Sequence, residues 1–425
     1  MLGTFEMIRE AQLSRLKERL SECKQVPIYR RRLSQRADFL AGDRDLAGFE
    51  EVPFISKREM REGFPGNFLH PGQSLERLLE EGLVELEHTS GTSEEQLQVF
   101  FGRGWWEDQE ERALRRNPFL CRALDNRPDA RRATLTTPAC NGRACFSPWR
   151  SRALRTMGKT LFVNQSRLPF LLGETDLARM ATEISDWSPL FLDVDPVHGA
   201  WFALYCERHG IRFPSLQFVL CSYEFVSVVH RRILERVFDI PVFNLYGSTE
   251  TGHLLMEGER GEMKPCYENA ILEVIEADRR GVGELAVTTL TNNYMPLLRY
   301  RIGDLVERKT QFEETTYIVH GRSHDSLRDR DGGRVTTWEV DQCFAGVRGV
   351  AHYQLHQDST KACRLRFVPD GRGPAAEEQR GLVSRLESLL QSPGRIEVEP
   401  MSFVLPAPSG KFRLTSSATI APGIN

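Results

Sequence analysis

The sequence lacks long apolar runs. No stretch approaches the ~20 residues that a membrane-spanning helix needs, and the strongest runs, 200–205 and 216–220, are short enough to belong to a protein core. Residues 1–10 include Glu6, Arg9 and Glu10 and contain no apolar segment of the kind that a signal peptide requires. We therefore expect a cytoplasmic protein without a membrane partner.

Cysteine spacings typical of metal or redox sites are also missing. The nine cysteines are odd in number and no two have CxxC spacing; Cys140 and Cys145 are five positions apart, which fits neither a zinc nor a redox template well. A chain of 425 residues can bury most of its apolar surface without disulfides. We expect reduced, mostly buried thiols.

A large excess of charge of either sign is absent. Lys and Arg total 56 and Asp and Glu total 59, so the formal net charge is −3. This balance excludes a general electrostatic attraction to nucleic acid or anionic lipid, although not a local basic patch. No internal repeat with a period of roughly 20–50 residues is visible. The signals for function must therefore come from short motifs.

The chain has the length of two to four domains, at roughly 100–200 residues per domain. Its first sixty residues are predicted to be helical. Leu13, Leu16 and Leu20 recur at the three- and four-residue spacing of an amphipathic helix. Ser56 and Glu59 have the spacing of a capping box, which predicts a second helix start.

From about residue 86, short apolar runs alternate with helical segments. The expected strands are 133–136, 161–163, 191–194, 216–221 and 242–245, and the expected helices include 174–186 and 226–238. Such alternation implies crossover connections and a largely parallel sheet.

The pattern changes after residue 269. The runs 270–275 and 283–289 predict an antiparallel hairpin, and the last ~100 residues, with strands 353–356 and 363–368 and helix 375–390, predict a small α+β unit. The prediction is an α/β protein. Its large N-terminal domain, 1–321, has mainly parallel sheets and a hairpin-rich subdomain, and its small mobile C-terminal domain spans 322–425.

One segment, Ala153–Thr160, nearly fits the phosphate-binding P-loop template. A P-loop follows a buried strand and opens a helix. Here the preceding residues make a poor strand, and the following Leu161-Phe162-Val163 make a good one. The order is reversed, so we expect Lys159 to be a surface charge at the start of a strand.

Five further segments carry chemistry-bearing side chains in a fixed order. They are Thr89-Ser90-Gly91-Thr92-Ser93, Tyr246-Gly247-Ser248-Thr249-Glu250, Tyr300-Arg301-Ile302-Gly303-Asp304, Gly321-Arg322-Ser323-His324-Asp325 and Gly410-Lys411. Taken singly, each also fits an ordinary polar turn, a helix cap, a charged linker or a surface lysine. A hydroxyl-rich glycine loop can surround an anion, and a carboxylate can hold Mg²⁺ against a phosphate or accept hydrogen bonds from ribose hydroxyls.

In this order the motifs resemble those of the adenylate-forming superfamily of acyl-CoA synthetases, adenylation domains and luciferases. The segments 26–30 and 52–57 resemble the phenylacetate–CoA ligase-like branch. The resemblance implies ATP-dependent activation of a carboxylic acid as an acyl-adenylate with release of pyrophosphate. Transfer to a thiol, most often coenzyme A, would follow, with rotation of the C-terminal domain between the steps.

The resemblance also implies roles for single residues. Thr89, Ser90, Gly91, Thr92 and Ser93 would contact the β- and γ-phosphates, and Ser222, Tyr223 and Glu224 would lie beside the adenine. Tyr246 would stack near the adenine within the Tyr246-Gly247-Ser248 turn, Thr249 would bind the α-phosphate and Glu250 would hold Mg²⁺. Asp304 would bind the ribose, with Arg322 nearby. Asp325 would lie in the hinge, and Lys411 would reach the α-phosphate and the acyl carboxylate.

The phosphate loop departs from the family pattern. It continues with Glu94 and Glu95 where a second glycine and a lysine are usual, and two carboxylates would repel a triphosphate. For zinc, which some branch members hold, Cys266 and His253 are the nearest candidates, but they do not complete a four-ligand set, so we expect none.

The sequence leaves the substrates open. Trp105-Trp106, 146–149 and 243–246 would provide aromatic walls for an acid, and Arg112–Arg116 and Arg150–Arg155 would recognise a second carboxylate or the coenzyme A phosphate, or form solvated helix faces. A carrier protein or an amine as acceptor, a homodimer, and a regulatory nucleotide-binding protein on a degenerate scaffold remain alternatives.

Overall fold

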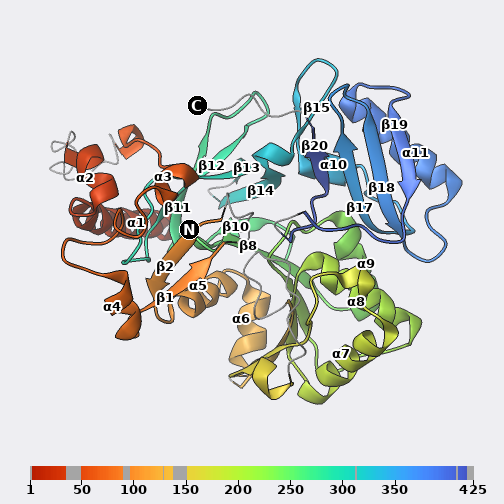
Figure 1. Cartoon of the computed structure of the whole chain (residues 1–425), viewed down its shortest axis with the longest axis horizontal. Coiled ribbons are helices and arrows are strands. Elements are labelled where there is room, and N and C mark those ends of the chain that lie inside the picture. The colour runs from red at the N-terminus through yellow and green to blue at the C-terminus, as the bar shows by residue number, and fades with distance from the viewer. Residues whose placement is uncertain are drawn as a thin grey trace. The chain divides into compact units, whose positions relative to one another are not determined.

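The computed structural model describes residues 2–34, 49–89, 96–127, 129–136, 151–311, 314–407 and 410–418. The chain divides into two compact units. Unit 1 comprises Met1–Cys121 and Leu245–Ile318, and unit 2 comprises Arg122–Asn244 and Val319–Asn425. Figure 1 labels the elements. The predicted boundary at residue 321 stays a prediction.

Unit 1 begins with helices. They are α1 (Leu2–Cys23), α2 (Pro27–Ser34), α3 (Lys57–Arg61), α4 (Leu75–Glu80), α5 (Trp105–Leu114) and α6 (Pro118–Asp125), which runs on into unit 2. The predicted amphipathic helix is α1, in which Leu16 and Leu20 are buried. The predicted capping box is also confirmed: Ser56 caps α3 and the Glu59 carboxylate accepts the Ser56 N–H.

The strands of unit 1 are antiparallel. They are β1 (Val84–His88) and β2 (Gln98–Gly102), which form a hairpin, and a sheet of β8 (Val242–Ser248), β9 (Gly252–Glu257), β10 (Met263–Pro265), β11 (Ala270–Ile275), β12 (Val282–Thr289), β13 (Tyr300–Gln311) and β14 (Glu314–Arg322). The first residues of β8 and the last residues of β14 belong to unit 2. The predicted hairpin 270–289 is therefore confirmed as β11 and β12, with partners from Ala270 and Thr289 to Ile275 and Glu284.

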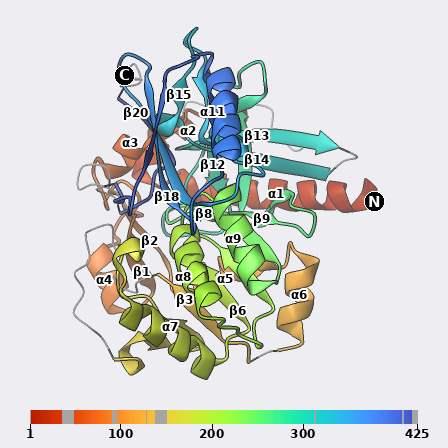
Figure 2. The ribbon, with the colours of Figure 1, turned by 90° about the vertical axis from the view of Figure 1, so that its right-hand side faces the viewer.

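Unit 2 contains the predicted parallel sheet. Its strands are β3 (Arg132–Leu135), β5 (Thr160–Phe162), β6 (Phe191–Val194), β7 (Phe218–Cys221) and the start of β8, with the short antiparallel β4 (Thr156–Met157) at the edge. The helices α7 (Glu174–Trp187), α8 (Pro196–Arg208) and α9 (Val228–Phe238) lie on one face of this sheet (Figure 2). The strands β6, β7 and β8 lie side by side in the order of the sequence. Because crossovers between parallel strands are right-handed, the connecting helices then lie on the same face of the sheet.

The rest of unit 2 is an α+β segment. Its elements are β15 (Leu327–Arg328), β16 (Arg334–Val335), α10 (Thr337–Gln342), β17 (Val350–Gln357), β18 (Cys363–Pro369), α11 (Ala376–Leu390), β19 (Ile396–Pro400) and β20 (Thr415–Ser417). The last sheet has the strand order β19-β18-β17-β20.

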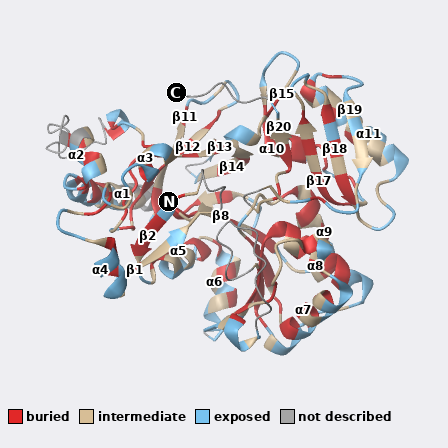
Figure 3. Cartoon of the chain, viewed as in Figure 1, coloured by how far each residue is buried: buried red, intermediate tan, exposed pale blue. Residues whose placement is uncertain are grey.

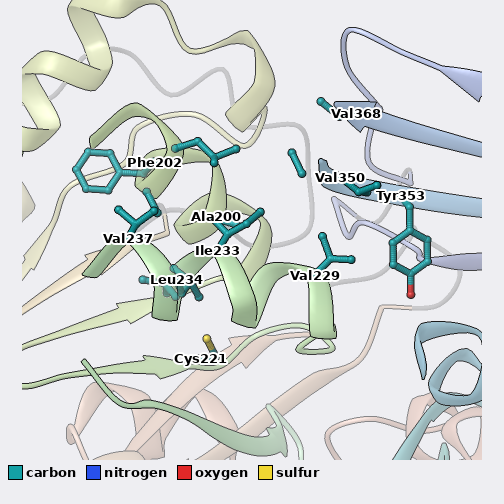
Figure 4. Packing of buried hydrophobic residues seen from close by; sticks show 14 of the residues in the cluster. Ala200, Phe202, Cys221, Val229, Ile233, Leu234, Val237, Val350, Tyr353 and Val368 are labelled. Atoms are coloured by element: carbon teal, nitrogen blue, oxygen red, sulfur yellow. The ribbon is translucent and has the colours of Figure 1, made fainter. Parts of the chain in front are cut away.

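One hydrophobic cluster joins both parts of unit 2. Val229 of α9 and Val350 and Tyr353 of β17 belong to it, and Figure 4 shows them close together. The helices α7 and α9 combine buried and exposed residues, as amphipathic helices on a sheet do, whereas α8 is exposed only at its last two residues, Glu207 and Arg208 (Figure 3). The predicted fold class is confirmed. Among the described helices, none combines the length and apolarity needed to cross a membrane.

Lys159 is exposed and directly precedes β5, as the reversed P-loop order predicts. Arg155 differs from both expectations for the arginine-rich segment. It is 1% exposed, and its guanidinium donates to both oxygens of Glu183, at 3.0 and 2.6 Å. Arg155 therefore has a structural role inside unit 2 and is neither a solvated charge nor an exposed anion-binding group.

Candidate active site

The segment Tyr246–Gly252 forms the end of β8 and the tight turn into β9, both in unit 1. Two glycines make this turn possible. A side chain at Gly247 would overlap the backbone of Gly252 and His253, and Gly252 has a φ of +72°. The Ser248 and Thr251 hydroxyls lie 2.9 Å apart and close the turn. The half-buried Thr249 and the buried Glu250 occupy its tip.

Two buried carboxylates define the candidate site in unit 1. Glu250 and Asp304 are each 5% exposed. The Tyr300 hydroxyl donates to Glu250 Oε1 at 2.9 Å, and the Tyr246 hydroxyl donates to Asp304 Oδ2 at 2.6 Å. A phenol is neutral, so its hydrogen bond contributes by orienting the carboxylate. Both tyrosines belong to the sequence motifs. Only the fold shows that each tyrosine donates a hydrogen bond to the acid of the other motif.

A bulge in β13 brings Asp304 into this arrangement. Arg301 pairs with Ala286 of β12, but Leu305 already pairs with Glu284, so β13 carries extra residues around Gly303. Gly303 has a φ of +85°, which favours glycine. Bulges of this kind change the direction of a side chain and are frequent beside active sites.

Thr89 closes the base of the candidate phosphate loop. Its backbone N–H donates to the Leu97 carbonyl at 2.9 Å, and its hydroxyl accepts the Leu97 N–H at 2.9 Å. The loop therefore joins the two strands of the β1–β2 hairpin. Ser90, Gly91, Thr92 and Ser93, together with Glu94 and Glu95, lie outside the described residues, as do 146–149.

In unit 2, Ser222 and Tyr223 gather around an acid that sequence reasoning missed. The Ser222 hydroxyl donates to Asp193 Oδ1 at 2.7 Å and the Tyr223 hydroxyl donates to Asp193 Oδ2 at 3.0 Å. Asp193 is an acidic residue inside the otherwise apolar strand β6, and this exception in the strand pattern was the available signal. The group lies near the carboxyl ends of β6 and β7, where ligands of α/β sheets bind.

Glu224 faces the segment that carries Lys411. Both of its carboxylate oxygens accept the backbone N–H of Phe412, each at 3.1 Å. Desolvation and the nearby Asp195 raise the pKa of Glu224 well above its ordinary value, whereas Lys411 and Arg167 oppose the shift. Asp195 itself caps α8 by accepting the N–H groups of Val197 and His198.

Arg322 ends β14 and directly precedes a 3-10 turn, Ser323–Asp325, in the segment predicted as a hinge. Asp325 Oδ1 lies 3.5 Å from Arg413 Nε and 3.4 Å from His324 Nε2. Thus Asp325 contacts the residue two positions after Lys411.

The fold gives His253, Cys266 and Trp105 packing roles. The His253 ring packs against Trp106 at an interplanar angle of 60° with ring centroids 4.7 Å apart, and burial raises the pKa of Cys266 to about 12. Trp105 Nε1 donates to the Thr291 hydroxyl at 3.1 Å. Within the described ranges, no group of three or more His, Cys, Asp or Glu residues is placed to hold a metal ion.

Comparison with known proteins finds similar sequences and similar folds. The chain is 25% identical over 374 residues to phenylacetate–coenzyme A ligase of Thermus thermophilus, a match that covers 82% of this chain and 78% of that protein. It has the adenylate-forming ligase fold. A crystal structure of 2-hydroxyisobutyryl–CoA ligase with an acyl-adenylate has a TM-score of 0.70, 18% identity, and covers 92% of this chain and 85% of its own. The predicted resemblance to the phenylacetate–CoA ligase-like branch is confirmed.

A shorter match is to protein CapK of Staphylococcus aureus. It is 30% identical over 120 residues, which make up 27% of this chain and 26% of CapK. No family model matches the chain.

Proposed function

We propose that the protein is an AMP-forming carboxylate–CoA ligase. The observation that carries the proposal is the pair of buried acids, Glu250 and Asp304, each oriented by a tyrosine hydroxyl. Two fixed acids suit the two demands of a nucleotide, a cation beside its phosphates and acceptors for its ribose hydroxyls. The similarity to phenylacetate–coenzyme A ligase supports the same activity.

In the first step, a carboxylate oxygen of the acid attacks the α-phosphorus of ATP. The bond from that phosphorus to the pyrophosphate oxygen breaks, and pyrophosphate leaves. In the second step, the sulfur of coenzyme A attacks the acyl carbon, the carbon–oxygen bond to AMP breaks, AMP leaves and the thiol proton passes to solvent. The protein's contribution is to position the reactants and to stabilise charge.

Unit 1 carries residues suited to several parts of a nucleotide. Tyr246 would lie against the adenine, Asp304 would accept the ribose hydroxyls and Thr249 would donate to the α-phosphate. Glu250 fits Mg²⁺, which is usually held by one or two carboxylates together with phosphate oxygens and would neutralise charge there. Thr89 and the loop after it would contact the β- and γ-phosphates.

Unit 2 carries further residues to which the resemblance gives roles. Ser222 and Tyr223 would lie beside the base, and Lys411 would stabilise the charge that develops on the α-phosphate. Arg322 would approach the ribose. Between the two steps, residues 322–425 would rotate about the region of Asp325 and withdraw Lys411, and Gly332 and Gly333 would ease the backbone change.

The decisive experiment is to measure pyrophosphate release with ATP, Mg²⁺ and a panel of aryl and small apolar acids, with and without coenzyme A. We expect release that depends on the acid, and a thioester when coenzyme A is present. Acid-dependent release that never yields a thioester would favour a carrier protein or an amine as acceptor. ATP binding without pyrophosphate release for any acid would contradict the proposed ligase activity and favour a regulatory nucleotide-binding role.

A further inference from the structure

The short segment Gly410-Lys411-Phe412 is fixed in unit 2 by its backbone. The Phe412 N–H donates to both oxygens of Glu224, at 3.1 Å each. On the other side, the Lys411 carbonyl accepts the Ala407 N–H at 2.8 Å, and the Gly410 N–H donates to the Ala407 carbonyl at 2.7 Å. Contacts before and after Lys411 therefore determine where its side chain starts.

The Phe412 ring anchors the same segment. It is 7% exposed and packs edge-on against Phe170 and His352, with centroid distances of 5.6 and 5.5 Å. A third ring, that of His198, lies at 6.4 Å. The three rings come from a 3-10 turn, β17 and α8. An aromatic residue that packs against three elements keeps little freedom to move. The backbone of its neighbour Lys411 is therefore well positioned.

Gly410 allows a close approach on the remaining side. Its φ is +82°, and a side chain there would collide with the guanidinium of Arg167. Arg167 in turn is attracted to Glu224 and Asp195. Lys411 and Arg167 thus bring two cations beside Glu224. The same carboxylate accepts the backbone N–H of Phe412, whose ring is the aromatic anchor.

We infer that Glu224 is a positioning residue for adenylation, which holds Lys411 in place by accepting the N–H of Phe412. This inference rests on the proposed function. It differs from the expected placement of Glu224 beside the adenine, because the acid acts through the lysine segment and needs no contact with the nucleotide. A residue that acts in this way affects the step that uses Lys411 and spares the step from which Lys411 is withdrawn.

The test separates the two half-reactions in the full-length protein. Adenylation is followed as acid-dependent exchange of pyrophosphate into ATP, and thioester formation is started from the prepared acyl-adenylate of an acid that the panel shows to be active. We expect Glu224→Ala to slow adenylation about 10- to 100-fold, as the loss of the acceptor for a buried N–H group predicts, and to leave thioester formation within about threefold.

Two further variants make the result specific. Glu224→Gln keeps an acceptor for the Phe412 N–H and is expected to recover most of the adenylation rate. Glu397→Ala removes an exposed glutamate of β19 that pairs with Arg364 at 3.0 Å and is expected to change neither step. Equal losses in both half-reactions for Glu224→Ala, or a higher KM for ATP with an unchanged kcat, would overturn the inference.

A readout without catalysis distinguishes failure of this inference from failure of the proposed function. Hydrogen exchange at the Phe412 amide is expected to accelerate in Glu224→Ala and not in Glu397→Ala. Unchanged exchange would overturn the positioning role even if the protein proves to be a ligase. Faster exchange in a protein that releases no pyrophosphate with any acid would uphold the contact with Phe412 but remove its role in adenylation, and the proposed function would fall with it.

Discussion

The two units hold their key acids in different ways. In unit 1, Glu250 and Asp304 accept hydrogen bonds from the neutral hydroxyls of Tyr300 and Tyr246, which orient the two carboxylates. In unit 2, Glu224 accepts a backbone N–H and lies near two cations, Lys411 and Arg167. The first arrangement suits ligand binding, and the second suits holding part of the chain itself. Residue type alone does not distinguish them.

The largest effect is expected from the lysine that the second arrangement holds. Lys411→Ala should lower acid-dependent pyrophosphate release by about 10²–10³-fold, the usual loss when a preorganised charge-stabilising group is removed. Binding of ATP, measured by calorimetry, should be nearly unchanged. Lys159→Ala, at an exposed position, is the matched control and also tests the P-loop alternative. Full adenylation by Lys411→Ala would show that the assignment is wrong.

In unit 1, removing an acid should cost more than removing its tyrosine partner. We expect Glu250→Gln to slow adenylation about 100-fold and to raise the Mg²⁺ concentration needed for half-maximal rate. Tyr300→Phe keeps the carboxylate and removes only the Tyr300 hydroxyl that donates to it, so a loss of about tenfold is expected, equal to about 1.4 kcal/mol. Steady-state rates across a Mg²⁺ titration check both. Equal losses would mean that the phenol does more than orient the acid.

The turn that presents Glu250 should be sensitive to added volume. Gly247→Ala is expected to lower the free energy of unfolding by about 2–3 kcal/mol, since its methyl group would overlap the backbone of Gly252 and His253. Gly173→Ala is the control, because nothing lies within 4 Å of the added carbon and its φ is ordinary. Urea unfolding of both variants measures the difference. Similar midpoints would show that the turn relaxes.

The smallest expected effect is on pH dependence, and it concerns the surroundings of Phe412. His230 and His352 are fully buried with Nε2 and Nδ1 3.0 Å apart. Burial lowers the pKa of His230 to about 3 and that of His352 well below its ordinary value. Below about pH 6.5 the unfolded chain binds protons that the folded chain does not. Well below that pH, each histidine therefore lowers the free energy of unfolding by about 1.4 kcal/mol per pH unit.

The buried Asp341 changes stability with pH in the opposite direction and offsets about one of these histidines. Burial raises its pKa to about 7, so between about pH 7 and 3.8 the folded state holds a proton that the unfolded state lacks, and acidification stabilises the fold through this group. The net loss of unfolding free energy from pH 6.5 to 5.5 should be about 0.8 kcal/mol, since an unfolded histidine is only half-protonated at pH 6.5. Urea midpoints against pH should flatten in His230→Gln and steepen in Asp341→Asn. An unchanged slope in both would contradict the assignment.

Local features of the fold were well predicted from the sequence. The amphipathic spacing in α1, the Ser56–Glu59 capping box, the alternation of strands and helices and the 270–289 hairpin are all observed. Each depends on the chemistry of a short window, because side-chain periodicity, caps and turns act over a few residues. The motif order likewise supported a resemblance that the comparison with phenylacetate–coenzyme A ligase confirms.

The partners of the site residues were less predictable. Asp193 lies within an apolar strand and Asp195 follows it as a helix cap, and neither belongs to a motif that the sequence singled out. Arg155 looked like an exposed charge but pairs with Glu183, 28 positions away and inside the core. These contacts depend on which elements become neighbours, and a local pattern does not contain that information.

The sequence by itself determined which side chains are available and where the backbone turns. The glycines at 247 and 252 specify the turn that carries Glu250, because only a residue without a side chain fits there. The tertiary structure decided what each acid does. Tyr300 reaches Glu250, Tyr246 reaches Asp304, and Phe412 reaches Glu224 across 188 positions. Chain separation of this size is overcome only by packing, so the roles of similar acids diverge only in the folded protein.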